Sequence, residues 1–155
     1  MTTSAHRFLA TWERWHRVPG GAWLFSQILG VLIPYSGTVR PLVRQLEPGV
    51  ARVTLKDRRA IRNHLNSIHA LALANLGELT GGLAVTAGLS PSVRGIVTRL
   101  SVDYLKKARG PLEAICRCEP PRVTEPLDYD VPIEIRDQSG DVVARVIARW
   151  RLSPS

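Results

Sequence analysis

A single carboxylate stands inside a long apolar stretch of this chain. Residues 67–88 read SIHALALANLGELTGGLAVTAG, and Glu78 is the only acidic side chain among them. A helix that is apolar all round is buried on every side, and a buried carboxylate must be neutralised, partnered or used. Glu78 is therefore a candidate nucleophile, or a candidate general base that activates water.

Three residues upstream of Glu78 offer a complementary chemistry. Asn63 precedes Glu78 by fifteen positions, and His69 and Ala70 stand at the expected start of the helix. A helix N-terminus presents free backbone N–H groups and the positive end of the helix dipole, which suit an oxygen that gains negative charge. The Asn63 amide could supply a second donor to the same oxygen. This pattern indicates chemistry at a carbonyl group.

The spacing of these residues requires two copies of the chain. Ala70 and Glu78 are eight residues apart on one helix, about 12 Å at 1.5 Å per residue, so both cannot touch one reacting carbonyl. Two copies with antiparallel central helices would bring Ala70 of one towards Glu78 of the other. We therefore expect a homodimer, and the sequence leaves open whether dimers pair into a homotetramer.

The first 36 residues are predicted to form an N-terminal helical extension. Phe8, Trp12 and Trp15 recur at helical spacing, so residues 4–16 are predicted to form a helix that ends before Pro19. A second short helix is expected over residues 22–33. The aromatic stripe favours core packing, with a membrane-surface role for the tryptophans as the alternative.

Residues 37–155 are predicted to form the main body, within a single domain overall. Two strands are expected around a turn at Glu47-Pro48-Gly49, followed by the helix, for which Asn66 or Ser67 could be the N-cap. Four strand-like runs follow, at residues 95–108, 111–119, 129–137 and 141–152. The expected fold class is α+β, with an antiparallel sheet of about five to six strands wrapped around one long central helix.

Composition bounds the class of protein. An excess of 21 Lys+Arg over 13 Asp+Glu gives a net charge of +8, which favours anionic partners, but nucleic-acid binding is the weakest of the functions weighed. Cys116 and Cys118 lack further ligands, so no metal site is expected, and reduced thiols fit a cytoplasmic location. Asn75 and Glu78 make the central helix costly in lipid, so no stable membrane insertion is expected.

The segments NHLNSIHALALANLGELTGG (63–82) and TRLSVDYLKKARG (98–110) also carry a resemblance. They resemble the hotdog-fold acyl-CoA thioesterases, especially the phenylacetate-degradation-type enzymes and an uncharacterised branch close to them. The resemblance covers about residues 39–152. In that family an Asn or Gln, a His-Gly pair and an Asp or Glu recur at the separations of Asn63, His69-Ala70 and Glu78. Tyr104-Leu105-Lys106 matches a recurring strand end.

The resemblance implies a hotdog fold and hydrolysis of an acyl-CoA, with no cofactor because coenzyme A is part of the substrate. It implies that Asn63 and the Ala70 N–H polarise the thioester carbonyl, and that Glu78 of the partner subunit attacks it or activates water. It also implies that His69 orients the loop or helps to bind the oxygen. The family often has a hydroxyl near the position of Thr98, and Ala70-Leu71 replaces its usual Gly-Gly. Candidates to bind the phosphates of coenzyme A are Arg94, Arg99, Lys106, Lys107 and Arg109.

Several alternatives stay open at this point. Glu78 could be a structural carboxylate, and Asn63 could serve only to fix a turn. His64 and Glu78 could instead form the pair of a hotdog dehydratase that acts on hydroxyacyl thioesters. A third alternative is a non-catalytic hotdog module that binds an acyl thioester. The sequence fixes neither the acyl group nor the choice between nucleophile and general base for Glu78.

Overall fold

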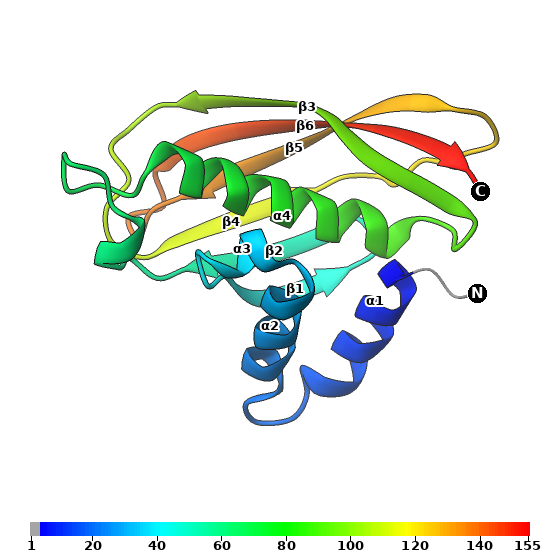
Figure 1. Ribbon diagram of the computed structural model, residues 1–155, viewed down its shortest axis with the longest axis horizontal. Helices are drawn as coiled ribbons and strands as arrows, with labels where there is room; N and C mark the ends of the chain where they lie inside the picture. Colours follow the sequence, from blue (N-terminus) through cyan, green and yellow to red (C-terminus); the bar gives the residue numbers. More distant parts are fainter. Residues whose placement is uncertain (1–3) are drawn as a thin grey trace.

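A six-stranded antiparallel sheet curves around one long helix in the computed structural model (Figure 1). The structure describes residues 4–155, and side chains from residue 8 onward. The sheet order is β1-β2-β4-β5-β6-β3. The bounds are β1 (Leu42–Glu47), β2 (Val50–Leu55), α4 (Ala70–Gly88), β3 (Val93–Tyr104), β4 (Leu112–Arg117), β5 (Leu127–Arg136) and β6 (Val142–Pro154). The expected order of two strands, one helix and four strands is confirmed.

The core lies between the concave face of the sheet and α4. Strand β6 shows the expected alternation, since Ala144, Val146, Ala148 and Trp150 are buried while the residues between them are more exposed. Helix α4 lies very close to this strand at Gly77, where an added Cβ would be 2.6 Å from Val146 Cγ2. Glycine at this position therefore permits the close packing of helix on sheet.

The start of α4 differs from the expectation. The N-cap is His69, not Asn66 or Ser67, and the helix begins at Ala70. Asn66 adopts a left-handed conformation with φ 56° in the preceding turn, and Ser67 donates to Asn63 within the same turn. Both residues therefore build the loop before the helix, and His69 takes the place of the cap.

The N-terminal helices pack on the β1 side of the sheet and on α4 (Figure 1). They are α1 (Ser4–Trp15), α2 (Gly21–Leu32) and the short α3 (Pro34–Gly37). Trp12 is buried, stacks on His16 and meets Phe25 edge to face, with ring centroids 5.3 Å apart in each pair. The aromatic stripe of α1 is therefore core packing, and the α3 turn was not expected.

One edge strand of the sheet is covered by a helix, and the other is open. Helix α2 covers β1, where the Val43 N–H donates to Ser26 Oγ at 2.9 Å. Strand β3 forms the other edge over twelve residues, with Ile96 66% exposed and Leu100 39% exposed. An open hydrophobic edge strand is a site for pairing with another chain.

Helix α4 is, within residues 4–155, the only helix long and apolar enough to cross a bilayer. In this structure 67% of an 18-residue apolar stretch of α4 is buried inside the protein, where the helix contacts the sheet and the N-terminal helices. Its apolar character is thus accounted for by its place at the centre of the fold.

Candidate functional site

Asn63 lies in the loop between β2 and α4, and the two polar atoms of its amide differ in their hydrogen bonding. Its Oδ1 accepts hydrogen bonds from the Leu65 N–H at 2.9 Å and from the N–H and Oγ of Ser67, both at 3.2 Å. These donors fix the orientation of the amide, so Oδ1 belongs to the turn. The Nδ2 group makes no hydrogen bond to any residue in the described range and remains available as a donor.

The first turn of α4 supplies a second donor beside this loop. His69 Nδ1 accepts from the Leu71 N–H at 3.1 Å, so this ring nitrogen is unprotonated and the ring acts as the helix cap. The Ala70 N–H has no acceptor among the residues that the structure describes. Tyr104 donates to the Ala70 carbonyl at 3.0 Å and ties the end of β3 to the start of the helix.

Asp57, which the sequence did not single out, holds the loop in place. Its Oδ1 accepts from Arg62 Nε at 2.7 Å and its Oδ2 accepts from the Gly110 N–H at 2.8 Å. The hydrogen bond from Arg62 lowers the pKa of Asp57. Since Ile68 N–H also donates to the Ala108 carbonyl at 2.8 Å, the loop is fastened along the segment that follows β3.

Glu78 lies on α4 at the wall of a cavity of about 500 Å³. Burial raises the pKa of this carboxyl group. Among the side chains of residues 8–155 it has neither a hydrogen-bond donor nor a cation as partner. The cavity is largely apolar, and its walls include Phe8, Ile33, Leu79, Leu83, Val93 and Trp150. The N-terminal helical part therefore helps to enclose the carboxylate.

Trp150 is a second residue that sequence reasoning missed. Its indole Nε1 is buried without a hydrogen-bond acceptor in the described part of the chain, and the ring borders the Glu78 cavity. A Cβ added to Gly82 would lie 3.2 Å from Trp150 Cζ2 and 4.0 Å from Glu78 Oε1. The missing side chain at position 82 thus leaves room between the indole and the carboxylate. Alternation along β6 could predict that Trp150 is buried, but not that it lines the same cavity as Glu78.

The candidate residues fall into two groups within one protomer. Asn63, His69 and Ala70 share the loop and the first turn of α4, whereas Glu78 lies eight residues along the helix, about 12 Å by its rise. His64 is exposed in the loop and does not line the Glu78 cavity. Within one chain, the N–H donors of the Asn63 loop and the Ala70 turn therefore lie too far from Glu78 to act on the same carbonyl group, as the spacing in the sequence predicts.

The basic candidates and Thr98 are not gathered in one place. Arg94 lines the Glu78 cavity, and Arg109 Nη2 donates to the Leu65 carbonyl at 3.3 Å, next to the Asn63 loop. Lys106 is held by Asp137 and Asp141, at 2.7 Å from each. Lys107 is exposed, while Arg99 lies on the convex face in a small hollow that includes Asp130.

Thr98 sits at a bulge of β3, where Val97 pairs with Trp150 and Arg99 pairs with Arg149. Its hydroxyl donates to the Arg149 carbonyl at 3.3 Å, and it does not line the Glu78 cavity. The described residues contain no cluster of three or more His, Cys, Asp or Glu side chains suited to a metal ion.

The comparison with family models decides the family. The model for the domain of unknown function DUF4442 matches residues 21–152. This chain belongs to the DUF4442 family. No curated protein matches the chain.

Solved structures related to this DUF4442 protein share its fold. The structural-genomics target APC5556 is 27% identical, with 97% of this chain and 99% of that chain covered and a TM-score of 0.82. A Pseudomonas aeruginosa protein described as a probable thioesterase is 23% identical over 84% of this chain and 91% of its own, with a TM-score of 0.72. A Haemophilus influenzae thioesterase is 13% identical over 81% and 88%, with a TM-score of 0.68. The expected hotdog fold, shared with thioesterase-family proteins, is confirmed.

Proposed function

We propose that this protein hydrolyses the thioester bond of an acyl-coenzyme A at a site shared by two protomers. The observation that carries the proposal is Glu78, a carboxylate with no partner among the described residues, at the wall of an apolar cavity. The free Asn63 amide and the free Ala70 N–H support it, because they are suited to a carbonyl oxygen. The fold shared with thioesterases adds weight to the same reaction.

The proposed reaction begins with the thioester carbonyl held by the Asn63 Nδ2 and the Ala70 N–H of one protomer. Glu78 of the partner subunit removes a proton from a water molecule, whose oxygen attacks the carbonyl carbon. The carbonyl oxygen becomes an oxyanion that the two donors stabilise. The C–S bond then breaks, the thiolate takes the proton from the carboxyl group, and the products are a free acid and coenzyme A. A raised pKa makes Glu78 a stronger base than an ordinary carboxylate.

Strand β3 is the proposed dimer interface. It is an open edge twelve residues long, and Ile96 and Leu100 are exposed on it. Antiparallel pairing of two β3 strands about a two-fold axis would set the two α4 helices antiparallel, as the site requires. Whether these dimers form tetramers does not alter the proposed site.

Three further features belong to the proposal. Arg109 and Lys107 follow β3 beside the Asn63 loop, where they could meet the phosphates of coenzyme A. The proposed location is the cytoplasm, where acyl-coenzyme A is present and where the free thiols Cys116 and Cys118 would stay reduced. The cavity beside Glu78, about 500 Å³ with mainly apolar walls, would receive the acyl group.

The test is release of free thiol from a panel of acyl-coenzyme A substrates. We expect Glu78→Gln, which keeps the shape of the side chain, to lose hydrolysis of every substrate that the wild type cleaves. The matched control is Glu125→Gln, because Glu125 is an exposed carboxylate outside the site. Equal thiol release by the wild type and Glu78→Gln would reject Glu78 as the catalytic group, and no release by either would favour a binding module.

A further inference from the structure

Helix α2 turns an apolar face to solvent. Phe25 and Leu29 are buried against the sheet, whereas Trp23 is 60% exposed, Val31 76% and Leu32 60%. Seven of the fourteen exposed large hydrophobic side chains in residues 8–155 lie between positions 18 and 35. Isolated exposed apolar residues are normal in soluble proteins, but a contiguous group on one helix marks an interaction surface.

This face lies far from the proposed dimer interface. Helix α2 covers β1, and β1 and β3 are opposite edges of the sheet (Figure 1). Pairing of two β3 strands therefore leaves the exposed side of α2 uncovered. With twelve residues α2 is too short to cross a bilayer, for which about 20 residues are needed.

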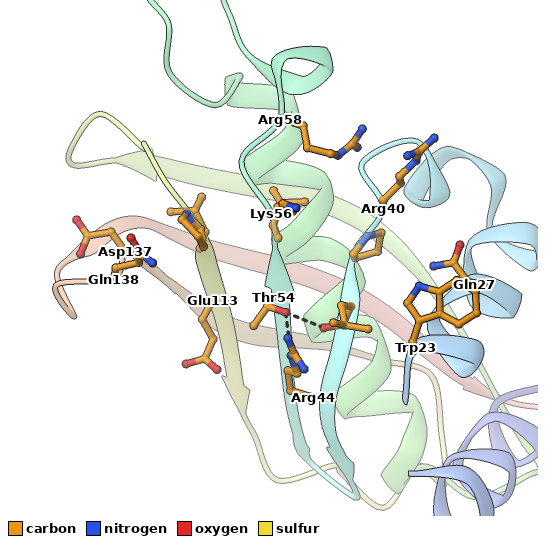
Figure 2. Close-up of a pocket in the computed structure, with 15 residues that line it drawn as sticks. Trp23, Gln27, Arg40, Arg44, Thr54, Lys56, Arg58, Glu113, Asp137 and Gln138 are labelled. Atoms are coloured by element: carbon orange, nitrogen blue, oxygen red, sulfur yellow. Dashed lines mark hydrogen bonds between the residues drawn. The ribbon is translucent and has the colours of Figure 1, made fainter. Parts of the chain in front are cut away.

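A basic hollow adjoins the apolar face. Figure 2 shows Trp23 and Gln27 of α2 at one side of this hollow, which has a volume of about 1090 Å³. Four cationic side chains line it, namely Arg40, Arg44, Lys56 and Arg58. Trp23 thus belongs both to the exposed apolar face and to the wall of the hollow.

The positive charge of this hollow is not balanced by the residues around it. None of its four cations forms an ion pair within the described part of the chain: Arg58 Nη2 donates to the carbonyls of Thr38 and Val39, at 3.2 and 3.0 Å, while its Nε is buried without an acceptor. The two carboxylates of the hollow are already engaged, since Glu113 binds Arg52 and Asp137 binds Lys106. The hollow therefore offers uncompensated positive charge to an anion.

We propose that the exposed face of α2 and this basic hollow form a docking surface for a bilayer that contains anionic phospholipids. The apolar side chains of α2 enter the boundary between headgroups and acyl chains, with α2 lying in the plane of the surface. Trp23 sits at headgroup level, and the four cations bind lipid phosphates. The charge complementarity of the hollow selects an anionic bilayer over a neutral one. This peripheral contact is distinct from membrane insertion and does not depend on the proposed hydrolysis.

Flotation of the protein with vesicles tests this docking surface. We expect the wild type to float with vesicles of phosphatidylcholine and phosphatidylglycerol, to float at least tenfold less with phosphatidylcholine alone, and to be released by salt. Val31→Gln/Leu32→Gln and Arg44→Gln/Lys56→Gln should each weaken binding about tenfold or more. The fluorescence emission of Trp23 is obtained by subtracting the spectrum of Trp23→Phe from that of the wild type. We expect its maximum to shift to shorter wavelength when anionic vesicles are added.

The matched controls are Ile147→Gln, an exposed apolar residue on the convex face of β6, and Arg117→Gln/Arg122→Gln, which removes the same charge elsewhere. Both should float like the wild type, and all variants should show an unchanged thermal unfolding midpoint. The proposal is overturned if the wild type does not float, or if neutral and anionic vesicles bind it equally. It is also overturned if Val31→Gln/Leu32→Gln abolishes self-association in sedimentation velocity without affecting flotation, or if ADP binds the hollow while anionic vesicles do not.

Discussion

The environment of Glu78 places the proposed function and the stability of the fold in opposition at a single side chain. Burial raises the pKa of the carboxyl group, and no cation or hydrogen-bond donor among the side chains of residues 8–155 offsets the charge. In the proposed reaction, a carboxylate whose ionised form is disfavoured would be a stronger base than an ordinary one. The same penalty lowers the free energy of unfolding whenever Glu78 is ionised.

Glu78→Gln should therefore unfold at a temperature at least as high as the wild type at neutral pH. The folded state binds the Glu78 proton more tightly than the unfolded state, whose pKa lies near the ordinary value of 4.5. The wild type thus loses stability as pH rises from that value through the raised folded-state pKa, while the Gln variant does not. Thermal unfolding of both proteins across this pH range measures the difference. A Gln variant that is less stable at neutral pH would mean that the carboxylate has a favourable partner.

Asn63 has a structural role in the turn and a proposed chemical role, and one substitution can separate the two. Asn63→Asp keeps an oxygen for the N–H groups of Leu65 and Ser67, but it removes the Nδ2 donor. We expect kcat to fall by about 10²–10³, as for loss of an oxyanion-hole donor, with little change in the unfolding midpoint. Asn63→Ala should lower both kcat and the midpoint. Equal kcat in the wild type and Asn63→Asp would show that Asn63 serves only the turn.

At the scale of elements, the hydrophobic pattern predicted the order of strands and helix because burial decides it locally. Alternation in β6 and the apolar run of α4 are properties of neighbouring residues. The predicted N-cap of α4 was wrong, because Asn66 and Ser67 are residue types that often cap helices. Here both belong to the turn before the helix, in a loop that Asp57 holds in place through contacts distant in the sequence. The ion pairs of Lys106 with Asp137 and Asp141 could not be predicted either, because these carboxylates lie more than thirty residues away in the sequence.

One buried hydroxyl group links α2 to β1 by a hydrogen bond. Ser26 Oγ donates to the Ala22 carbonyl at 2.7 Å and accepts from the Val43 N–H at 2.9 Å, and Ser26 is buried. Ser26→Ala leaves a buried N–H without an acceptor, so the free energy of unfolding should fall by about 1–3 kcal/mol. Urea denaturation measures this loss. Ser139→Ala, in an exposed turn, is the control and should change the value by less than about 0.5 kcal/mol.

The whole molecule is expected to function as a pair. Ile96→Lys/Leu100→Lys places two cations on the open β3 edge and should yield monomers in sedimentation velocity, with loss of acyl-CoA hydrolysis. Ile147→Lys, on the convex face of the interior strand β6, should keep both assembly and hydrolysis. A monomeric variant with full activity would place the complete site within one chain.

The cover that α2 provides for β1 also limits how far assembly can proceed. Of the two outer strands, one is occupied by the chain's own helix and one is open. When the open β3 strands of two copies pair, neither copy has another free edge strand to which a third copy could add. The arrangement favours a closed stoichiometry of two over an endless fibril, so the α2–β1 contact is also a safeguard against aggregation.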